Sequence, residues 1–177
     1  MARRMPVFLM ALSMLFGPRA ALAQGGIQQA ASAPTAHIFG VRLGMVGGVT
    51  ASGHVIAAHD HFVALPSSRA LSSPGTSDHS VLVTYKGRSL AAPVWDVGPW
   101  NDSDDFWAVP RTGAPGLARM VPEAQAASMN GYNGGLALDG HTSITSPAAI
   151  DIADGLFEDL GMTEGDWVDV SFLWLTS

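Results

Sequence analysis

The sequence predicts one small, mainly β domain that closes, or nearly closes, into a barrel. Two stretches carry the alternation of apolar and polar residues that half-buried strands show, a hairpin over 80–96 and a final run over 167–174. The chain has 20 glycines, several of which interrupt apolar runs, and hardly any helical periodicity. Short strands with Gly-rich corners favour a barrel over a parallel sheet flanked by helices.

The chain starts with the pattern of an export signal. Arg3 and Arg4 precede an apolar run over 6–16, and Ala21-Leu22-Ala23 is a small-residue cleavage site. The run is shorter than the roughly 18 residues that span a bilayer, so we expect a cleaved signal peptide, residues 1–23, and not an anchor. The polar, Ala-rich stretch 24–37 then reads as a flexible tether, and 38–177 as the single domain.

Charge and composition exclude several classes of partner. Removing residues 1–23 leaves six basic against fifteen acidic residues, a formal charge of −9. Nucleic acid and anionic membrane surfaces both attract clusters of Lys and Arg, so neither is expected as a partner. The absence of cysteine excludes disulfides, thiol catalysis and thiolate metal sites. We expect a monomer that is secreted or periplasmic and carries no cofactor.

The expected strands follow from local patterns. The run 38–49 is apolar but broken by glycines, which indicates a strand that bends. Within the hairpin, a turn at 86–88 separates a strand over 81–85 from a second over 89–96. In the last run, one face should go to the core, and its members are Val168, Val170, Phe172 and Trp174.

Two short helices and one long loop complete the prediction. The segment 100–147 is rich in Gly, Asn and Pro and shows only a short helix over 122–128, where Pro122 suits a first turn. A loop of this length in a compact domain is usually functional or disordered. A second helix over 152–160 should end at Gly161.

Five short pieces of sequence occur in an order typical of one family. They are Thr50-Ala51-Ser52-Gly53, Ala57-Ala58-His59, Leu65-Pro66, Val94-Trp95-Asp96-Val97-Gly98-Pro99 and Ile150-Asp151-Ile152-Ala153. In this order they resemble the rare lipoprotein A-like double-psi β-barrels, of which expansins and family 45 glycoside hydrolases are more distant versions. The resemblance covers roughly 48–174. It implies a six-stranded double-psi β-barrel with one or two short helices and a long inserted loop.

The resemblance implies a protein associated with the cell wall or another polysaccharide. Its partner would be a polysaccharide or the glycan of peptidoglycan, and its activity that of a lytic transglycosylase-like enzyme cleaving glycan strands. Lytic members carry a glutamate where this chain has His54, which favours the alternative of a non-catalytic, expansin-like polysaccharide-binding module. A protein-interaction or inhibitor barrel is a third hypothesis.

Three residues are candidates for catalysis. By the resemblance, Asp96 and Asp151 occupy the positions of the family's acid or acid-positioning carboxylate, and breaking a glycosidic bond needs an acid to protonate the leaving oxygen. His59 could hydrogen-bond Asp96 or the substrate. The structural alternatives are that Asp96 binds backbone N–H groups of the turn after it, and that Asp151 caps a helix.

Four residues are candidates for substrate binding. Flat aromatic side chains present apolar area to sugar rings, which makes Trp100, Trp107 and Tyr132 candidates, and His54 joins them by its place after the first signature. We expect Trp95 to belong to the core.

The sequence favours no metal site. A zinc hypothesis based on His54, His59, Asp60 and His61 lacks a recognised spacing. The acidic run 101–105 lacks the glycine and the distant glutamate of an EF-hand loop, so we expect a solvated acidic loop there.

Overall fold

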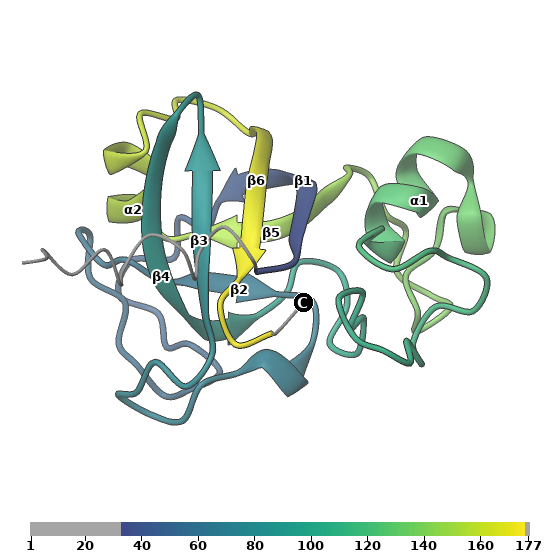
Figure 1. The fold of residues 1–177 in the computed structure, drawn as a ribbon, viewed down its shortest axis with the longest axis horizontal. Coiled ribbons are helices and arrows are strands. Elements are labelled where there is room, and N and C mark those ends of the chain that lie inside the picture. The colour runs from purple at the N-terminus through teal and green to yellow at the C-terminus, as the bar shows by residue number, and fades with distance from the viewer. Residues whose placement is uncertain (1–32, 176–177) are drawn as a thin grey trace, which may run out of the picture.

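The computed structural model describes residues 33–175, in which six strands form a closed barrel (Figure 1). Their order around the barrel is β1-β5-β2-β4-β3-β6. The strands are β1 (Thr35–Arg42), β2 (Val63–Leu65), β3 (Ser80–Tyr85), β4 (Arg88–Val97), β5 (Ala148–Ile152) and β6 (Asp166–Phe172). Two pairs, β1 with β5 and β2 with β4, are parallel, and the other four are antiparallel. The mainly β, six-stranded barrel is confirmed and fits a double-psi β-barrel.

The first strand begins earlier than predicted. Thr35 and His37 are exposed and Ala36 is buried, and all three pair with β6, so 35–37 belong to the barrel and not to the tether. An alternation over three residues is too short to stand out in the sequence. The strand also ends at Arg42 and does not continue to 49. The predicted signal peptide lies outside the described residues.

The interior of the barrel is filled by side chains that point inward at alternate positions along the strands. In β6, Val168, Val170 and Phe172 are buried as predicted, whereas Trp174 lies beyond the end of the strand. Each fully buried aliphatic side chain contributes about 1.5–3 kcal/mol. Other strand side chains without exposed surface in this core include Ile38, Val63, Leu65, Val81, Val83, Val94, Ile150 and Ile152.

Helix α2 (Asp154–Asp159) confirms the second predicted helix. Leu156 and Phe157 are buried on one face, and Gly161 follows with φ of +80°, a conformation in which glycine suffers no steric cost. At Gly155 a Cβ would approach the backbone of His59 to 2.4 Å. Only glycine therefore fits at this contact between the helix and the chain before β2. No helix of residues 33–175 is long and apolar enough to cross a bilayer.

The segment predicted as a long loop forms a lobe beside the barrel (Figure 1). It contains α1 (Glu123–Asn130) and the 3-10 turn η3 (Tyr132–Gly135), and a second turn, η2 (Ser68–Ala70), lies on the barrel side. The predicted helix over 122–128 is confirmed with its ends shifted by one or two residues. The lobe has its own small core, formed by Ala124, Ala127, Ala137 and Ile144, with Trp100 packed against it.

Two of the three acids in the run 101–105 are buried, so the prediction of a solvated acidic loop holds only for Asp102. Asp104 has no exposed surface. Its carboxylate accepts one hydrogen bond from the Arg111 guanidinium at 2.7 Å and one from the Glu123 backbone N–H at 2.6 Å. Asp105 is 1% exposed and pairs with Arg69 of η2 at 2.5 Å. Burial raises the pKa of Asp104. Arg69 lies 36 residues before Asp105, so the run of acids alone did not indicate this partner.

Candidate functional site

The two predicted catalytic carboxylates lie in one row across neighbouring strands of the barrel. Asp96 of β4 and Asp151 of β5 are both register partners of Ala64, in the strand β2 between them. Register partners share a face of a sheet, and two strand spacings put their Cα atoms about 10 Å apart. The flanking residues Val63 and Leu65 point into the core, so the two carboxylates lie on the outer face of the barrel.

Asp151 is a carboxyl group that stays protonated to unusually high pH. Burial, and second the negative charge of Asp96, raise the pKa of Asp151 to about 7. The described residues offer its carboxyl oxygens no hydrogen bond, and the backbone leaving β4 passes close by, since a Cβ on Gly98 would lie 3.6 Å from Oδ2. Asp151 lies within β5 and the N-cap of α2 is Ala153, so Asp151 does not cap the helix.

Asp96 has a structural task as well. Its Oδ1 accepts hydrogen bonds from the backbone N–H groups of Ala51 and Val97, both at 2.9 Å. The bond to Val97 confirms the predicted role in the turn after β4. The bond to Ala51 fastens the loop between β1 and β2 beside the carboxylate row.

The described residues show no direct hydrogen bond between His59 and Asp96, and a role of His59 toward the substrate stays a prediction. The His59 side chain is exposed, and the Asp96 carboxylate is bonded to the backbone instead. The Ala57-Ala58-His59 piece places His59 against Gly155 at the start of α2, where its backbone makes the contact. His59 therefore keeps no direct link to the acidic pair.

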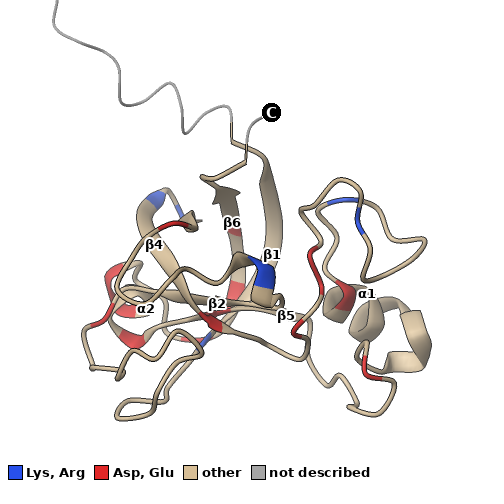
Figure 2. Cartoon of the chain, turned by 90° about the horizontal axis from the view of Figure 1, so that it is seen from below, with Lys and Arg blue, Asp and Glu red and all other residues tan. Residues whose placement is uncertain are grey.

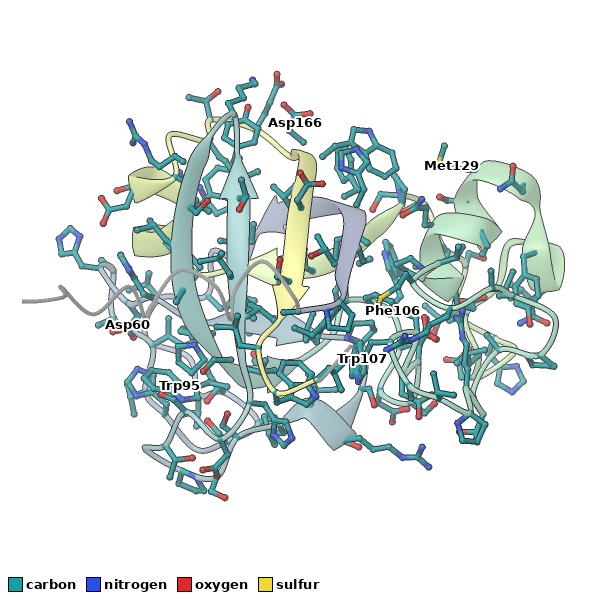
Figure 3. All side chains as sticks on the ribbon, viewed as in Figure 1. Asp60, Trp95, Phe106, Trp107, Met129 and Asp166 are labelled. Atoms are coloured by element: carbon teal, nitrogen blue, oxygen red, sulfur yellow. The ribbon has the colours of Figure 1, made fainter. Side chains whose placement is uncertain are left out.

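His54 is held by the loop that carries it. Its Nε2 lies 2.6 Å from Oδ2 of Asp60, and its ring packs on Trp95 with centroids 4.6 Å apart. Trp95, which Figure 3 labels together with Asp60, is half-buried against Phe62, and its indole donates to the Thr76 carbonyl at 2.8 Å. Trp95 thus supports the loop, in line with the expected core role. Within residues 33–175 no group of three or more His, Asp or Glu side chains could hold a metal ion.

A cleft of about 400 Å³ opens where β4 meets the lobe. Its walls are Val97, Gly98, Trp100, Asn101, Asp102, Ser103, Leu138 and Asp139. Val97 follows Asp96 in the chain, and a Cβ on Gly98 would lie 3.6 Å from Oδ2 of Asp151, so the cleft lies beside the carboxylate row.

Trp100 carries two local costs in the wall of this cleft. Its φ is +66°, in the left-handed region that bulky residues rarely adopt, and its buried Nε1 has no acceptor among the described residues. Strain and unsatisfied polar atoms of this kind cluster at functional sites. Trp100 is the one predicted binding residue that lines the cleft.

The prediction that Trp107 binds substrate is wrong. Trp107 is 4% exposed and packs against Phe106, Phe172 and Trp174, at the side of the barrel that faces the lobe (Figure 3). Tyr132 is half-buried in the lobe, donates to the Pro115 carbonyl at 3.0 Å, and is not part of the cleft wall. The sequence around these aromatic residues is polar and rich in Gly, so it did not indicate that Trp107 is buried.

Sequence reasoning missed the cleft residues that come from the lobe. Asn101 accepts from the Leu138 N–H at 2.8 Å and donates to Glu123 at 2.9 Å, which joins the two walls. The Asp139-Gly140 pair is a turn signal, but a turn signal does not say which segment the turn packs against. Nothing in the sequence indicated that this loop returns to residues 97–103.

Replacing Asp96 should separate its structural task from its charge. Asp96→Asn keeps the acceptor Oδ1 and both backbone bonds, so we expect little change in the free energy of unfolding. Asp96→Ala removes the acceptor of two N–H groups and should cost about 1–3 kcal/mol. Chemical denaturation of both variants measures this, and equal stability of Asp96→Ala and wild type would contradict the bonding pattern.

The comparisons with known proteins show limited similarity. Among solved structures, Streptomyces papain inhibitor matches with a TM-score of 0.41 and 16% identity, over 78% of this chain and 94% of its own. A mutant Clavibacter michiganensis expansin in complex with cellohexaose matches with a TM-score of 0.41 and 12% identity, over 78% of this chain and 50% of its own. Similarity this low carries no functional argument, and the barrel assignment rests on the strand pairing. No curated protein matches the sequence.

One family covers most of the chain. Residues 34–171 match a family described as a domain of unknown function, DUF8814. The match runs from just before β1 into the end of β6 and so includes the whole barrel and the lobe. The chain belongs to this family, DUF8814.

Proposed function

We propose that this protein binds a polysaccharide strand across the outer face of the barrel and cleaves it by a lytic reaction in which Asp151 is the acid. The observation that carries the proposal is the row of Asp96 and Asp151 on either side of Ala64, next to a cleft. The candidate signal peptide at 1–23 supports a place of action outside the cytoplasm, on cell-wall or other extracellular glycan.

Asp151 has the protonation state that the first step needs. With a pKa of about 7, it still holds a proton in mildly acidic to neutral solution, and general acids work best with a pKa near the working pH. It would donate this proton to the glycosidic oxygen as the bond from C1 to that oxygen breaks. The sugar's own C6 hydroxyl would then bond to C1 and return its proton to Asp151, giving an anhydro-sugar.

Asp96 complements the acid. Its negative charge lies near the reacting carbon, where positive charge develops as the bond breaks. The two backbone N–H groups that hold its Oδ1 fix the carboxylate in place, so no reorganisation is needed when the charge forms.

A second candidate is a non-catalytic polysaccharide-binding module of the expansin kind. The observation in its favour is His54, which stands where lytic relatives have a glutamate and whose Nε2 is already engaged with Asp60. Binding to the same face would then occur without bond breakage.

Incubation of purified mature protein with peptidoglycan and with cellulose, followed by mass analysis for anhydro-sugar ends, tests the proposal. Asp151→Asn should lower the cleavage rate at least about 100-fold, the usual contribution of a general acid, while leaving binding intact. The wild-type rate should fall as pH rises above about 7, because Asp151 then loses its proton.

Asp169→Asn is the matched control, since Asp169 is an exposed carboxylate on β6, away from the row. Binding without cleavage by the wild type would establish the non-catalytic module instead. Absence of both binding and cleavage would reject both candidates.

A further inference from the structure

The walls of the cleft are acidic and contain an aromatic ring. Two of the eight lining residues, Asp102 and Asp139, are carboxylates, Trp100 supplies the ring, and no Lys or Arg is among them. Along the ribbon, Asp and Glu also outnumber Lys and Arg (Figure 2). A site with this composition attracts a positive charge and repels a negative one.

The two carboxylates differ in how they are bound. Asp139 accepts from the backbone N–H groups of His141 and Thr142 and from the Thr142 hydroxyl, bonds that lower the pKa of Asp139 to about 2. It is therefore a permanent negative charge at the cleft. Asp102 is exposed, and its carboxylate makes no hydrogen bond or ion pair with the other described residues, so it is free to bind a ligand.

Two arginines contact the acids that follow Ser103 in the chain, but they do not neutralise the cleft wall. Arg69 pairs with Asp105, and Arg111 pairs with Asp104. Each of these cations is balanced by a carboxylate outside the cleft wall. The charges of Asp102 and Asp139 are thus left for a ligand.

We propose that the cleft binds the ammonium group of an amino sugar, so that the preferred substrate is a glycan with free, not acetylated, amino groups. The ammonium group would pair with Asp102 and lie against the Trp100 ring, and face-on contact of a cation with an indole is favourable. The proposal rests on the proposed function, because the cleft adjoins Asp96 through Val97 and Gly98 and so would hold a unit beside the one at the carboxylate row.

The proposal is tested by measuring the binding of four hexamers to the mature protein with Asp151→Asn, in which cleavage should be at least about 100-fold slower. The probes are the hexamers of glucosamine, of N-acetylglucosamine, of glucose in β-1,4 linkage and of galacturonic acid, in mildly acidic buffer at low salt. The glucosamine hexamer should bind about tenfold more tightly than the acetylated and glucose hexamers, and the galacturonate hexamer should bind most weakly. Raising the salt should reduce the preference, because exposed charges are screened.

Asp102→Asn, added to the same protein, should reduce the preference for the glucosamine hexamer over the glucose hexamer about three- to fivefold, in the range of an exposed ion pair. Glu164→Gln is the matched control, because it removes one exposed carboxylate from the turn before β6, outside the cleft wall. It should leave the preference unchanged.

The outcomes separate this proposal from the proposed function. Equal binding of the glucosamine and glucose hexamers would overturn the amino-sugar inference and leave glycan binding in place. Failure of all four to bind would reject the proposed function itself. Binding of hexalysine as tight as that of the glucosamine hexamer, and equally dependent on Asp102, would show a site for amines of peptides and overturn the assignment to a glycan.

Discussion

Asp151→Asn should remove a large part of the pH dependence of stability. The pKa of Asp151 is about 7 in the folded protein and about 3.8 in the ordinary carboxyl group, so the folded state holds the proton more tightly than the unfolded one. The stability linked to this proton is complete below about pH 4 and is lost as pH rises to about 7. At 1.36 kcal/mol per pKa unit, the wild type should lose at most about 4 kcal/mol from this group.

Urea denaturation at several pH values between about 4 and 8 measures this difference. The Asn variant should become more stable than the wild type toward neutral pH, because an amide has no charge to bury. Asp96→Asn should show a smaller change in the same direction, since it removes the lesser cause of the shift. Glu164→Gln, an exposed carboxyl group, is the control. Parallel profiles of the wild type and Asp151→Asn would contradict the burial of the Asp151 carboxyl group.

Trp107→Ala should destabilise the protein by about 3–5 kcal/mol, the usual cost of removing a large aromatic side chain from a core. Trp107 contacts Phe106, Phe172 and Trp174, with ring centroids 4.9, 5.2 and 5.9 Å away. The cavity would open in the barrel core near the lobe, where these rings cannot close it. The melting temperature should fall by about 10 °C or more.

Trp100→Ala is the informative comparison. Trp100 is half-buried, has a positive φ and leaves a buried indole nitrogen unsatisfied, so its removal should cost less stability. It should instead weaken glycan binding. A stable Trp107→Ala variant that had lost glycan binding would return Trp107 to the site and contradict its burial.

The elements predicted from sequence are those that depend on neighbouring residues. The β3–β4 hairpin follows from alternation on both sides of a Lys86-Gly87 turn, whose φ values are positive. Helix α2 follows from an apolar face and the glycine after it. These signals lie within one element, so the sequence displays them directly.

The carboxylate row shows where the resemblance helped and where it stopped. It indicated Asp96 and Asp151, and the register of β2 with its two neighbours places both beside Ala64. It also indicated His59, but the side chain of this residue is exposed and Asp96 bonds to Ala51 and Val97. A short motif does not specify the direction in which a loop side chain points.

By itself, the sequence determined the mainly β character of the chain, its hairpin, its last strand and the types of residue available for acid chemistry. Only the tertiary structure decided which acids are buried, which tryptophan lines a cleft, and which residues of the lobe face the end of β4. Burial and partner choice depend on contacts between distant segments, such as Arg69 with Asp105 and Asn101 with Leu138. Those contacts exist only once the barrel has closed and the lobe has packed against it.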